Sequence, residues 1–437
     1  MDQQMTDKIR EVLEGKYHDP ETGQALSVPI GCVAIERDLR GMEADLVRGL
    51  GFGRSLAIVS DQNTHKAMGQ RVESALGSFA AVTSVVLPHG THPDLETVER
   101  VTAETTTADA LIAVGSGTIN DLCKCSSARQ RKPYAVFATA PSMNGYTSVN
   151  AAITVGGLKK TLPAQGASGV FMDVQVLANS PMRLILSGYG DSICRSTAQA
   201  DWLLSHKVCG TEYREAPYDL LYEAETALFA EPYAIAARDP VAVEYLARLL
   251  TLSGLGMTIC GGSAPASQGE HMISHFIDML PPSGWRGAYH GEQVAVTTVT
   301  SAAIQEAVLD LPAPTLSESQ TTRAMIDNVF GKDLGQLCWE QYEPKQLRRE
   351  NVDTINARLH SAWPELRDHA QTHSWSSQRI RDTLKAAGAP TAPEDIGLSS
   401  EYYRTAVTFA RTIRNRFSFL DVACDLDGIE IAQFVDL

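Results

Sequence analysis

Three of the eleven histidines in this 437-residue chain lie in one stretch, residues 261–294, and their spacing suggests chemistry. His271 and His275 are four positions apart, so on a helix they share one face. His290 follows in a loop-like setting, just before an apolar run. Converging neutral imidazoles are good ligands for zinc or a similar divalent metal. Two helix-surface histidines and one capping histidine would give the same spacing, so this stretch alone leaves both interpretations open.

A second pattern is the run VGSGTIND at residues 114–121, where an apolar strand passes through two glycines into a helix. Glycines let the backbone approach a phosphate, and N–H groups at a helix start bind it. Asn120 stands where the third glycine of the dinucleotide fingerprint is expected, and a tight turn is the alternative. The place after the third strand of a parallel sheet favours a nucleotide pyrophosphate site. The expected nucleotide contacts are Gly115, Ser116, Gly117, Thr118 and Asp121.

Two further polar segments follow strands of the same predicted sheet. Asp61 ends the first strand, where a carboxylate can accept hydrogen bonds from a ribose, although a helix N-cap is the simpler interpretation. The hydroxyl-rich loop 140–148 follows the fourth strand, at the edge where ligands bind in such folds. This loop is therefore expected to line a site. Its residues of interest, with the end of the strand before it, are Thr139, Ser142, Asn144 and Ser148.

One carboxylate stands apart from these segments. The run GYGDS at residues 188–192 is predicted to open a helix that continues to Asp201. Asp191 suits a helix N-cap, and it equally suits the oxygen ligand that completes a metal site with two histidines.

The elements that must position these residues fall into two classes. Strands are predicted at 54–60, 81–87, 110–114 and 133–139, with helices at 63–76, 95–105 and 118–128 between them. Such alternation indicates a parallel, doubly wound sheet. Beyond about residue 180 the helical period dominates, including helices at 184–206 and 317–330. The sequence thus predicts an α/β Rossmann-like domain over residues 1–179 and an all-α domain over 180–437.

Composition narrows the class of protein. The net charge of −15, without a basic cluster, argues against nucleic acid as the main partner. The eight cysteines are scattered and are expected to be reduced thiols. The first residues lack the apolar core of a signal peptide, and no apolar run approaches the length of a membrane span. We therefore expect a cytoplasmic protein.

Taken in order, these segments resemble the glycerol-1-phosphate dehydrogenases, and the bacterial branch most closely. The resemblance begins near residue 25 and continues to the end of the chain. It rests on the GSG turn, PSMNGYTS at 141–148, KKTLPA at 159–164, the run from Gly190 to Trp202, GEHMISH at 269–275 and HGEQVA at 290–295. These enzymes belong to a superfamily with iron-containing alcohol dehydrogenases, glycerol dehydrogenase and dehydroquinate synthase. The resemblance implies a Rossmann-like domain, a helical domain, NAD or NADP, and a divalent metal.

The resemblance also assigns roles to residues. It implies that Asp191, His271 and His290 are the metal ligands. His275 is expected near the substrate or beside the ligands, and it is the reserve ligand because some relatives use it as one. It places the pyrophosphate at residues 115–118, and Lys159 or Lys160 at a substrate anion. Asn144 stands where the family has an aspartate, and Ala264 stands where it has an arginine. Both departures alter polar groups beside the expected substrate site.

The function expected from these residues is reversible hydride transfer between NAD(P)H and a small phosphorylated ketone. The preferred pair is dihydroxyacetone phosphate and sn-glycerol 1-phosphate, with Asn144 and His275 in catalytic roles. The alternatives are a dehydroquinate-synthase-like cyclase and a dehydrogenase of another polyol or polyol phosphate. Zinc, nickel and iron all suit the ligand set, and the resemblance implies a homo-oligomer.

Overall fold

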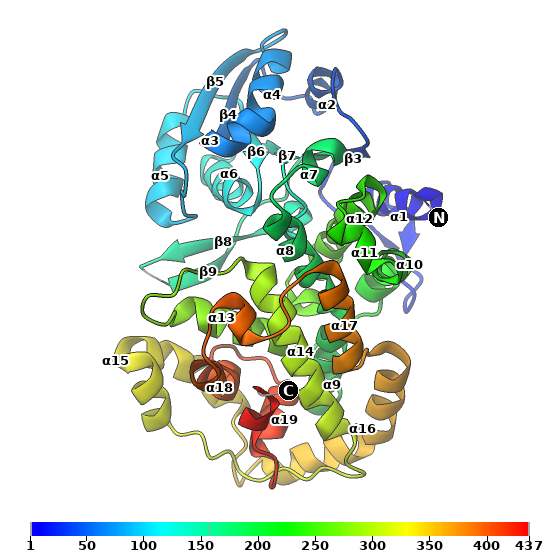
Figure 1. Cartoon of the computed structure of the whole chain (residues 1–437), viewed down its shortest axis with the longest axis vertical. Helices are drawn as coiled ribbons and strands as arrows, with labels where there is room; N and C mark the ends of the chain where they lie inside the picture. The colour runs from blue at the N-terminus through cyan, green and yellow to red at the C-terminus, as the bar shows by residue number, and fades with distance from the viewer. Residues whose placement is uncertain (1, 157, 436–437) are drawn as a thin grey trace. The chain divides into compact units, whose positions relative to one another are not determined.

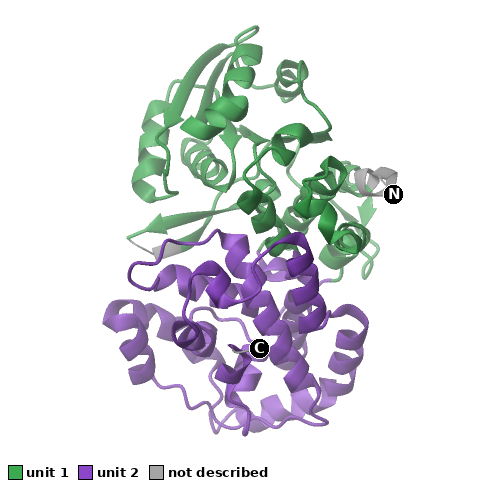
Figure 2. Ribbon diagram, in the orientation of Figure 1, with its two compact units in different colours: residues 1–192, 215–262 green, residues 193–214, 263–437 purple. Residues whose placement is uncertain are grey.

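The computed structural model describes residues 2–156 and 158–435, and Figure 1 shows the order of their helices and strands. The chain divides into two compact units, each made of two chain segments (Figure 2). Unit 1 comprises residues 1–192 and 215–262, and unit 2 comprises residues 193–214 and 263–437. The boundary expected from the sequence, between residues 179 and 180, follows the last strand of the sheet, and the elements after it are helices. As a domain boundary it stays a prediction.

Unit 1 is organised around a parallel sheet of six strands. Each position of the three central strands β6, β7 and β10 is buried, as expected when helices cover both faces. This confirms the doubly wound sheet. Two strands, β3 and β10, are missing from the sequence-based prediction. The order across the sheet is β3 (Cys32–Glu36), β10 (Gly169–Asp173), β7 (Tyr134–Ala138), β6 (Ala110–Gly115), β4 (Ser55–Asp61) and β5 (Ala81–Leu87).

Helices flank this sheet in unit 1. On one face, α2 (Glu43–Gly49), the π-helical turn His65–Gly69 and α4 (Gln70–Leu76) contribute Val47, Met68 and Val72 to a core with alternate residues of the strands. A second pair of helices, α5 (Leu95–Glu104) and α6 (Gly117–Gln130), pack on each other, and α6 packs on β6. Both begin at the carboxyl ends of strands, where loops meet.

The remaining elements of unit 1 include two small hairpins that the sequence did not reveal. Residues 15–38 contain β3 and the first hairpin, which pairs β1 (Tyr17–His18) with β2 (Ala25–Leu26). The second hairpin pairs β8 (Asn150–Val155) with β9 (Leu158–Pro163) in antiparallel register. The other helices are α1 (Asp2–Leu13), α3 (Gln62–Thr64), α7 (Val174–Ala178), α8 (Met182–Ile193), α10 (Ala216–Ala230), α11 (Pro232–Ala236) and α12 (Pro240–Ile259).

Unit 2 is built from helices around one extended apolar core, which includes Phe276, Ile304 and Trp363. This confirms the helical C-terminal region. None of the described helices is long and apolar enough to cross a membrane. The main helices are α9 (Arg195–Cys209), α13 (Gly269–Met279), α14 (His290–Leu309), α15 (Arg323–Tyr342), α16 (Val352–His373), α17 (Ser377–Ala387), α18 (Ser400–Phe409) and α19 (Phe419–Asp425).

Several expected element boundaries were wrong. The single helix expected over 184–206 is two, because α8 ends at Ile193 and α9 begins at Arg195. Asp191 therefore lies in the last turn of α8 and does not cap a helix start. His290 is the first residue of α14 and not part of a loop. The helix expected from 317 begins six residues later, because the Thr322 side chain accepts a hydrogen bond from the Met325 N–H and caps it there.

Candidate active site

The strand order places a topological switch point in the sheet of unit 1. From β4 the chain moves outward to β5, then crosses back to β6 on the other side of β4. The loops that follow β4 and β6 therefore leave in opposite directions, and a crevice forms between them at the carboxyl edge. Asp61 ends β4 and Gly115 ends β6, so both flank this point. This is where such sheets bind nucleotides.

The turn from β6 into α6 needs glycine at its first position. A Cβ on Gly115 would lie 2.5 Å from the Ile119 Cβ, whereas one on Gly117 would meet only the Met143 side chain, at 3.5 Å. Ser116 is the N-cap, and its side chain makes no capping hydrogen bond. The N–H groups of Gly117 and Thr118 thus open α6 without a side-chain cap, which is the arrangement that receives a phosphate.

Asp61 caps the short helix that follows β4. Its Oδ1 accepts hydrogen bonds from the N–H groups of Asn63 (2.7 Å) and Thr64 (2.9 Å), and the Thr64 hydroxyl completes a capping box. The capping interpretation of Asp61 is therefore correct. Both bonds end on the same oxygen, so a contact between the other oxygen and a ribose stays a prediction.

The hydroxyl-rich loop after β7 is packed inside unit 1 and does not face solvent as a whole. Thr139, Ser142 and Ser148 are buried, and the Ser187 hydroxyl donates to the Ser142 carbonyl at 3.1 Å. The Asn144 amide group donates to the Ser253 hydroxyl at 3.2 Å. The loop conformation is thus fixed from α8 and α12 before any ligand binds.

A buried lysine that the sequence reasoning missed anchors this loop. Lys124 on α6 is fully buried, and its ammonium donates to the carbonyl oxygens of Gly145 (2.7 Å) and Asn150 (2.9 Å) and to the Ser148 hydroxyl (3.2 Å). Burial lowers the pKa of Lys124 to about 8, against the opposing charge of Asp121. The signal in the sequence is weak, because Lys124 is the one charged residue of the four-residue run LCKC at 122–125.

Asp121 itself is engaged within the protein. Its carboxylate accepts hydrogen bonds from the Ala152 N–H at 3.1 Å and the Asn120 amide at 3.3 Å. These bonds attach the β8–β9 hairpin to α6, and a contact of Asp121 with nucleotide stays a prediction.

Lys160 is exposed on β9. The side chain of Lys159 lies outside the described residues.

Replacing Lys124 by methionine is expected to lower the free energy of unfolding by about 2–4 kcal/mol, because two carbonyl groups lose their donor in a buried site. Chemical denaturation measures this loss. The exposed Lys66→Met change is the matched control and should stay within about 0.5 kcal/mol of wild type.

The folded-state pKa of Lys124 is depressed, so the unfolded chain binds more protons than the folded protein between about pH 8 and 10.5. The stability of wild type relative to Lys124→Met should therefore rise across that range, and a flat or falling difference would contradict this account.

Asp191 is buried in the last turn of α8 in unit 1. Its Oδ2 accepts the backbone N–H of Asn144 at 3.1 Å, which ties α8 to the loop after β7. Gly188, one turn earlier, permits this approach, because a Cβ there would lie 1.8 Å from the Pro141 carbonyl oxygen. The loop and Asp191 are thus held as one rigid part of unit 1.

In unit 2, the three histidines of the first motif form one cluster. The ring centroids of His271 and His290 are 5.1 Å apart, those of His275 and His290 are 5.7 Å apart, and those of His271 and His275 are 6.1 Å apart. His271 is buried, whereas the other two are half-buried. The first residue of α14 therefore comes beside two residues on one face of α13, as two ligands from different helices require.

A buried carboxylate orients His271. The Nδ1 atom of His271 lies 2.8 Å from Oε1 of Glu270, which also accepts the Gln268 N–H. Burial raises the pKa of Glu270, but its hydrogen bond to His271 and the imidazole charge outweigh burial, so the pKa is lowered overall. An ionised Glu270 accepts a hydrogen bond from the Nδ1–H of His271, so Nε2 carries the lone pair and is the ligand atom. Metal-bound histidines are held by such carboxylates.

A chain of hydrogen bonds fixes His290 in the same way. The amide nitrogen of Gln293 donates to Asp278 at 3.0 Å, so its oxygen is the atom that accepts the Ser274 hydroxyl at 2.9 Å. The single proton of Ser274 is thereby used, and its oxygen faces Nδ1 of His290 at 3.5 Å. His290 therefore donates through Nδ1 and, like His271, presents Nε2 as a ligand atom.

A second combination of metal-binding atoms exists in unit 2. One ligand atom each of Cys194, Glu270 and His271 lie within 4.8 Å of one another, and all three residues are buried. The Glu270 oxygens are already engaged, because Oε1 binds His271 and Oε2 accepts the Thr197 hydroxyl at 3.3 Å. This group therefore fits a hydrogen-bonded support for His271 better than a metal site.

The amino-acid sequence of this chain is similar to those of known proteins over most of its length. Residues 34–181 match the family model described as iron-containing alcohol dehydrogenase. A glycerol-1-phosphate dehydrogenase of Pyrococcus furiosus is 31% identical over 389 residues, covering 89% of this chain and 92% of that protein. The chain belongs to the glycerol-1-phosphate dehydrogenase family. It is therefore an oxidoreductase. A Bacillus licheniformis glycerol-1-phosphate dehydrogenase is 25% identical, covering 93% of this enzyme and 90% of that protein.

Solved structures confirm the fold of the enzyme. A maleylacetate reductase from Agrobacterium tumefaciens superimposes with a TM-score of 0.61 at 16% identity, covering 94% of this chain and 96% of that one. A glycerol dehydrogenase from Schizosaccharomyces pombe gives 0.59 at 16% identity, covering 93% and 87%. At such identity the likeness concerns the fold alone.

The role of Glu270 is open to a direct test. Glu270→Gln is expected to weaken metal binding about 10- to 100-fold, because the amide cannot both hold the Nδ1 proton of His271 and keep its other bonds. Metal content after dialysis against a graded series of chelator concentrations measures the change. Glu340→Gln, an exposed acid on α15, is the control and should behave as wild type. Unchanged metal retention in Glu270→Gln would show that the carboxylate does not support the site.

Proposed function

We propose that the enzyme transfers a hydride between NAD(P)H and a small phosphorylated ketone. It reduces dihydroxyacetone phosphate to sn-glycerol 1-phosphate, and with NAD(P)+ it catalyses the reverse oxidation. The relatives that cover most of the chain carry the name glycerol-1-phosphate dehydrogenase, NAD(P)+. The observation that carries the chemistry is the pair His271 and His290, whose Nδ1 atoms are both directed to hydrogen-bond partners. That arrangement suits metal-assisted reduction of a carbonyl group.

The proposed ligands of a divalent metal are Asp191, His271 and His290. Two imidazoles with defined tautomers and one buried carboxylate are a catalytic ligand set, which leaves positions open. When bound, such a metal supplies a Lewis acid for the substrate oxygen. Zinc is the first choice, with nickel and iron as alternatives, because this set of nitrogen and oxygen donors accepts all three.

NAD(P) is proposed to lie at the switch point between β4 and β6. The N–H groups at the start of α6, from Gly117 and Thr118, would hold the pyrophosphate. The second oxygen of Asp61 would accept a ribose hydroxyl, which favours NAD, since a carboxylate repels a 2′-phosphate. When bound, the nucleotide supplies the hydride. Thr139, Ser142 and Ser148 would line the nicotinamide end.

Other side chains of the enzyme have proposed roles toward the substrate. Asn144 would orient a substrate hydroxyl through its amide, which the Ser253 hydroxyl already holds. His275 would exchange the proton of the substrate hydroxyl at a ring nitrogen, since it lies beside His290. Lys159 and Lys160 of β9 are proposed contacts for a substrate anion.

The test is oxidation of NADH and NADPH over a panel of phosphorylated and free ketoses, with metal analysis of the same sample. We expect dihydroxyacetone phosphate to be the best substrate, one nucleotide to be oxidised per ketone reduced, and about one divalent metal per chain. Turnover of a substrate without net oxidation of nucleotide would instead show a cyclase of the dehydroquinate synthase type. A clear preference for an unphosphorylated polyol would overturn the phosphate part of the proposal.

A further inference from the structure

Two arginines from the far end of the chain reach the loop that precedes the histidine cluster in unit 2. Arg414 Nη1 donates to the Ser267 hydroxyl at 3.2 Å. Arg416 donates to the Ser267 carbonyl through Nη1 and to the Ser263 hydroxyl through Nη2, the latter at 2.9 Å. The loop carries the 3₁₀ turn Ala264–Ala266, where the resemblance would have placed an arginine. Positive charge is thus present at this loop, but it comes from a segment some 150 residues away.

Among the described residues neither guanidinium group is in a salt bridge, although the charge of Glu270 acts on both and favours their charged form. Both side chains are half-buried, and within the described part of the chain their hydrogen bonds go only to serine hydroxyls and one carbonyl. Burial lowers the pKa of Arg414 to about 10, and burial together with the charge of Arg414 lowers the pKa of Arg416 to about 9. Buried charges in proteins are normally paired, so this arrangement is more favourable once an anion is bound.

A buried aspartate fixes where these arginines lie relative to the histidines. One oxygen of Asp201 accepts the N–H of Gly269, at the start of α13, at 2.9 Å. The other accepts the N–H of Phe419, at the start of α19, at 2.8 Å. Arg416 lies three residues before Phe419, and His271 lies two residues after Gly269. Asp201 therefore joins the arginine segment to the helix that carries His271.

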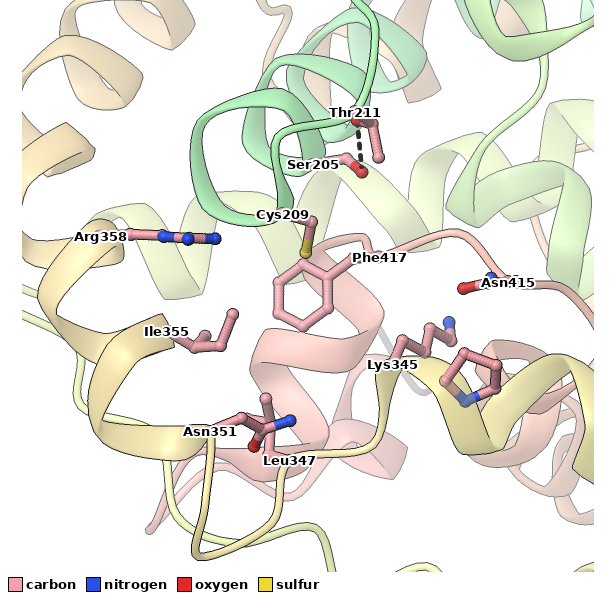
Figure 3. Close-up of a pocket in the computed structure, with 11 residues that line it drawn as sticks. Ser205, Cys209, Thr211, Lys345, Leu347, Asn351, Ile355, Arg358, Asn415 and Phe417 are labelled. Carbon is pink, nitrogen blue, oxygen red and sulfur yellow. Dashed lines mark hydrogen bonds between the residues drawn. The ribbon is translucent and has the colours of Figure 1, made fainter.

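The neighbouring residues of the segment face a different place. Asn415 and Phe417 line a cavity of about 240 Å³ in unit 2, together with Lys345 and Arg358 (Figure 3). In that cavity the Lys345 ammonium pairs with Asp421 at 3.0 Å, and Arg358 donates to the Val208 carbonyl at 3.2 Å. Alternate residues of the segment thus serve two sides, and Arg414 and Arg416 are on the side of the loop that precedes the histidine cluster.

We propose that Arg414 and Arg416, with the hydroxyls of Ser263 and Ser267, bind the phosphate group of the substrate. This deepens the proposed function and rests on it. A phosphate monoester carries nearly two negative charges and three acceptor oxygens, which matches two guanidinium groups. Each serine oxygen accepts from an arginine and keeps its own proton to donate, so the hydroxyls add two donors to the set.

The test compares a phosphorylated ketone with its free counterpart. Arg414→Gln, Arg416→Gln and the double variant are assayed with dihydroxyacetone phosphate and with dihydroxyacetone. Each single change is expected to raise KM for dihydroxyacetone phosphate about 10- to 100-fold, since charge-assisted hydrogen bonds to the phosphate are lost. The value of kcat/KM for dihydroxyacetone should change less than about threefold, because that ketone makes no such bonds. Arg349→Gln, an exposed arginine of unit 2, is the control.

Parallel loss of activity on both ketones, or an unchanged KM for dihydroxyacetone phosphate, would overturn the assignment. Arg414→Lys and Arg416→Lys serve if a glutamine variant does not fold, since they keep the charge and lose only the forked geometry. Calorimetric titration of inorganic phosphate into wild type and into the double variant tests the arginine assignment without relying on the proposed function. If wild type does not prefer the phosphorylated ketone, the proposed function fails. The arginine assignment then stands only if phosphate binds wild type and not the double variant.

Discussion

Alanine in place of His271 or His290 is expected to leave the purified enzyme with far less than one metal per chain and to reduce turnover about 10³-fold or more. Loss of Lewis-acid assistance removes several kcal/mol of transition-state stabilisation, and each 1.36 kcal/mol corresponds to a factor of about ten in rate. Both effects should appear together, because each imidazole presents Nε2 through a hydrogen bond that a replacement cannot reproduce. Elemental analysis and initial rates on one preparation measure them.

Three further variants make this result specific. His18→Ala, at an exposed histidine of β1, should match wild type in metal content and rate. Cys194→Ala should keep its metal. If Cys194→Ala instead loses its metal and His290→Ala keeps it, the metal site would be the group of Cys194, Glu270 and His271. His275→Ala should keep metal and lose rate if it carries the proton. Full metal content and full activity in both His271→Ala and His290→Ala would exclude the proposed site.

The second large effect is expected at the turn from β6 into α6. Gly115→Ala should lower the free energy of unfolding by about 1–3 kcal/mol and abolish measurable NAD(P)H binding, because the new Cβ would overlap Ile119 on the turn that opens α6. Gly117→Ala should leave stability within about 0.5 kcal/mol of wild type, since its Cβ meets only an ordinary contact at 3.5 Å.

Nucleotide binding separates these two glycines. If the pyrophosphate approaches the N–H groups of Gly117 and Thr118, a methyl group at Gly117 should weaken binding about tenfold or more without unfolding the enzyme. Fluorescence titration with NADH gives the affinity, and chemical denaturation gives the stability. Normal nucleotide affinity in Gly117→Ala would place the pyrophosphate elsewhere and would remove the main support for this turn as the nucleotide site.

Local pattern was enough to predict much of the fold. Strands β4, β6 and β7 were found because parallel strands covered on both faces are continuous apolar runs, and the edge strand β5 was found although most of its positions are not buried. The shared face of His271 and His275 follows directly from helical spacing. The edge strand β3, most of whose positions are only half-buried, was missed. The break between α8 and α9 was missed because the helical pattern continues through Cys194.

The sequence by itself determined the residue types available for chemistry: three histidines, a GSG turn and a hydroxyl-rich loop, each next to an element that its own pattern predicts. Only the tertiary structure decided how those side chains are directed. The tautomer of His290 depends on Gln293 and Ser274, the anchoring of the loop after β7 depends on Lys124, and the positive charge at Ala264 comes from Arg414 and Arg416. These contacts join residues up to 153 positions apart, and a local pattern cannot encode them, because they form only when separate helices pack together.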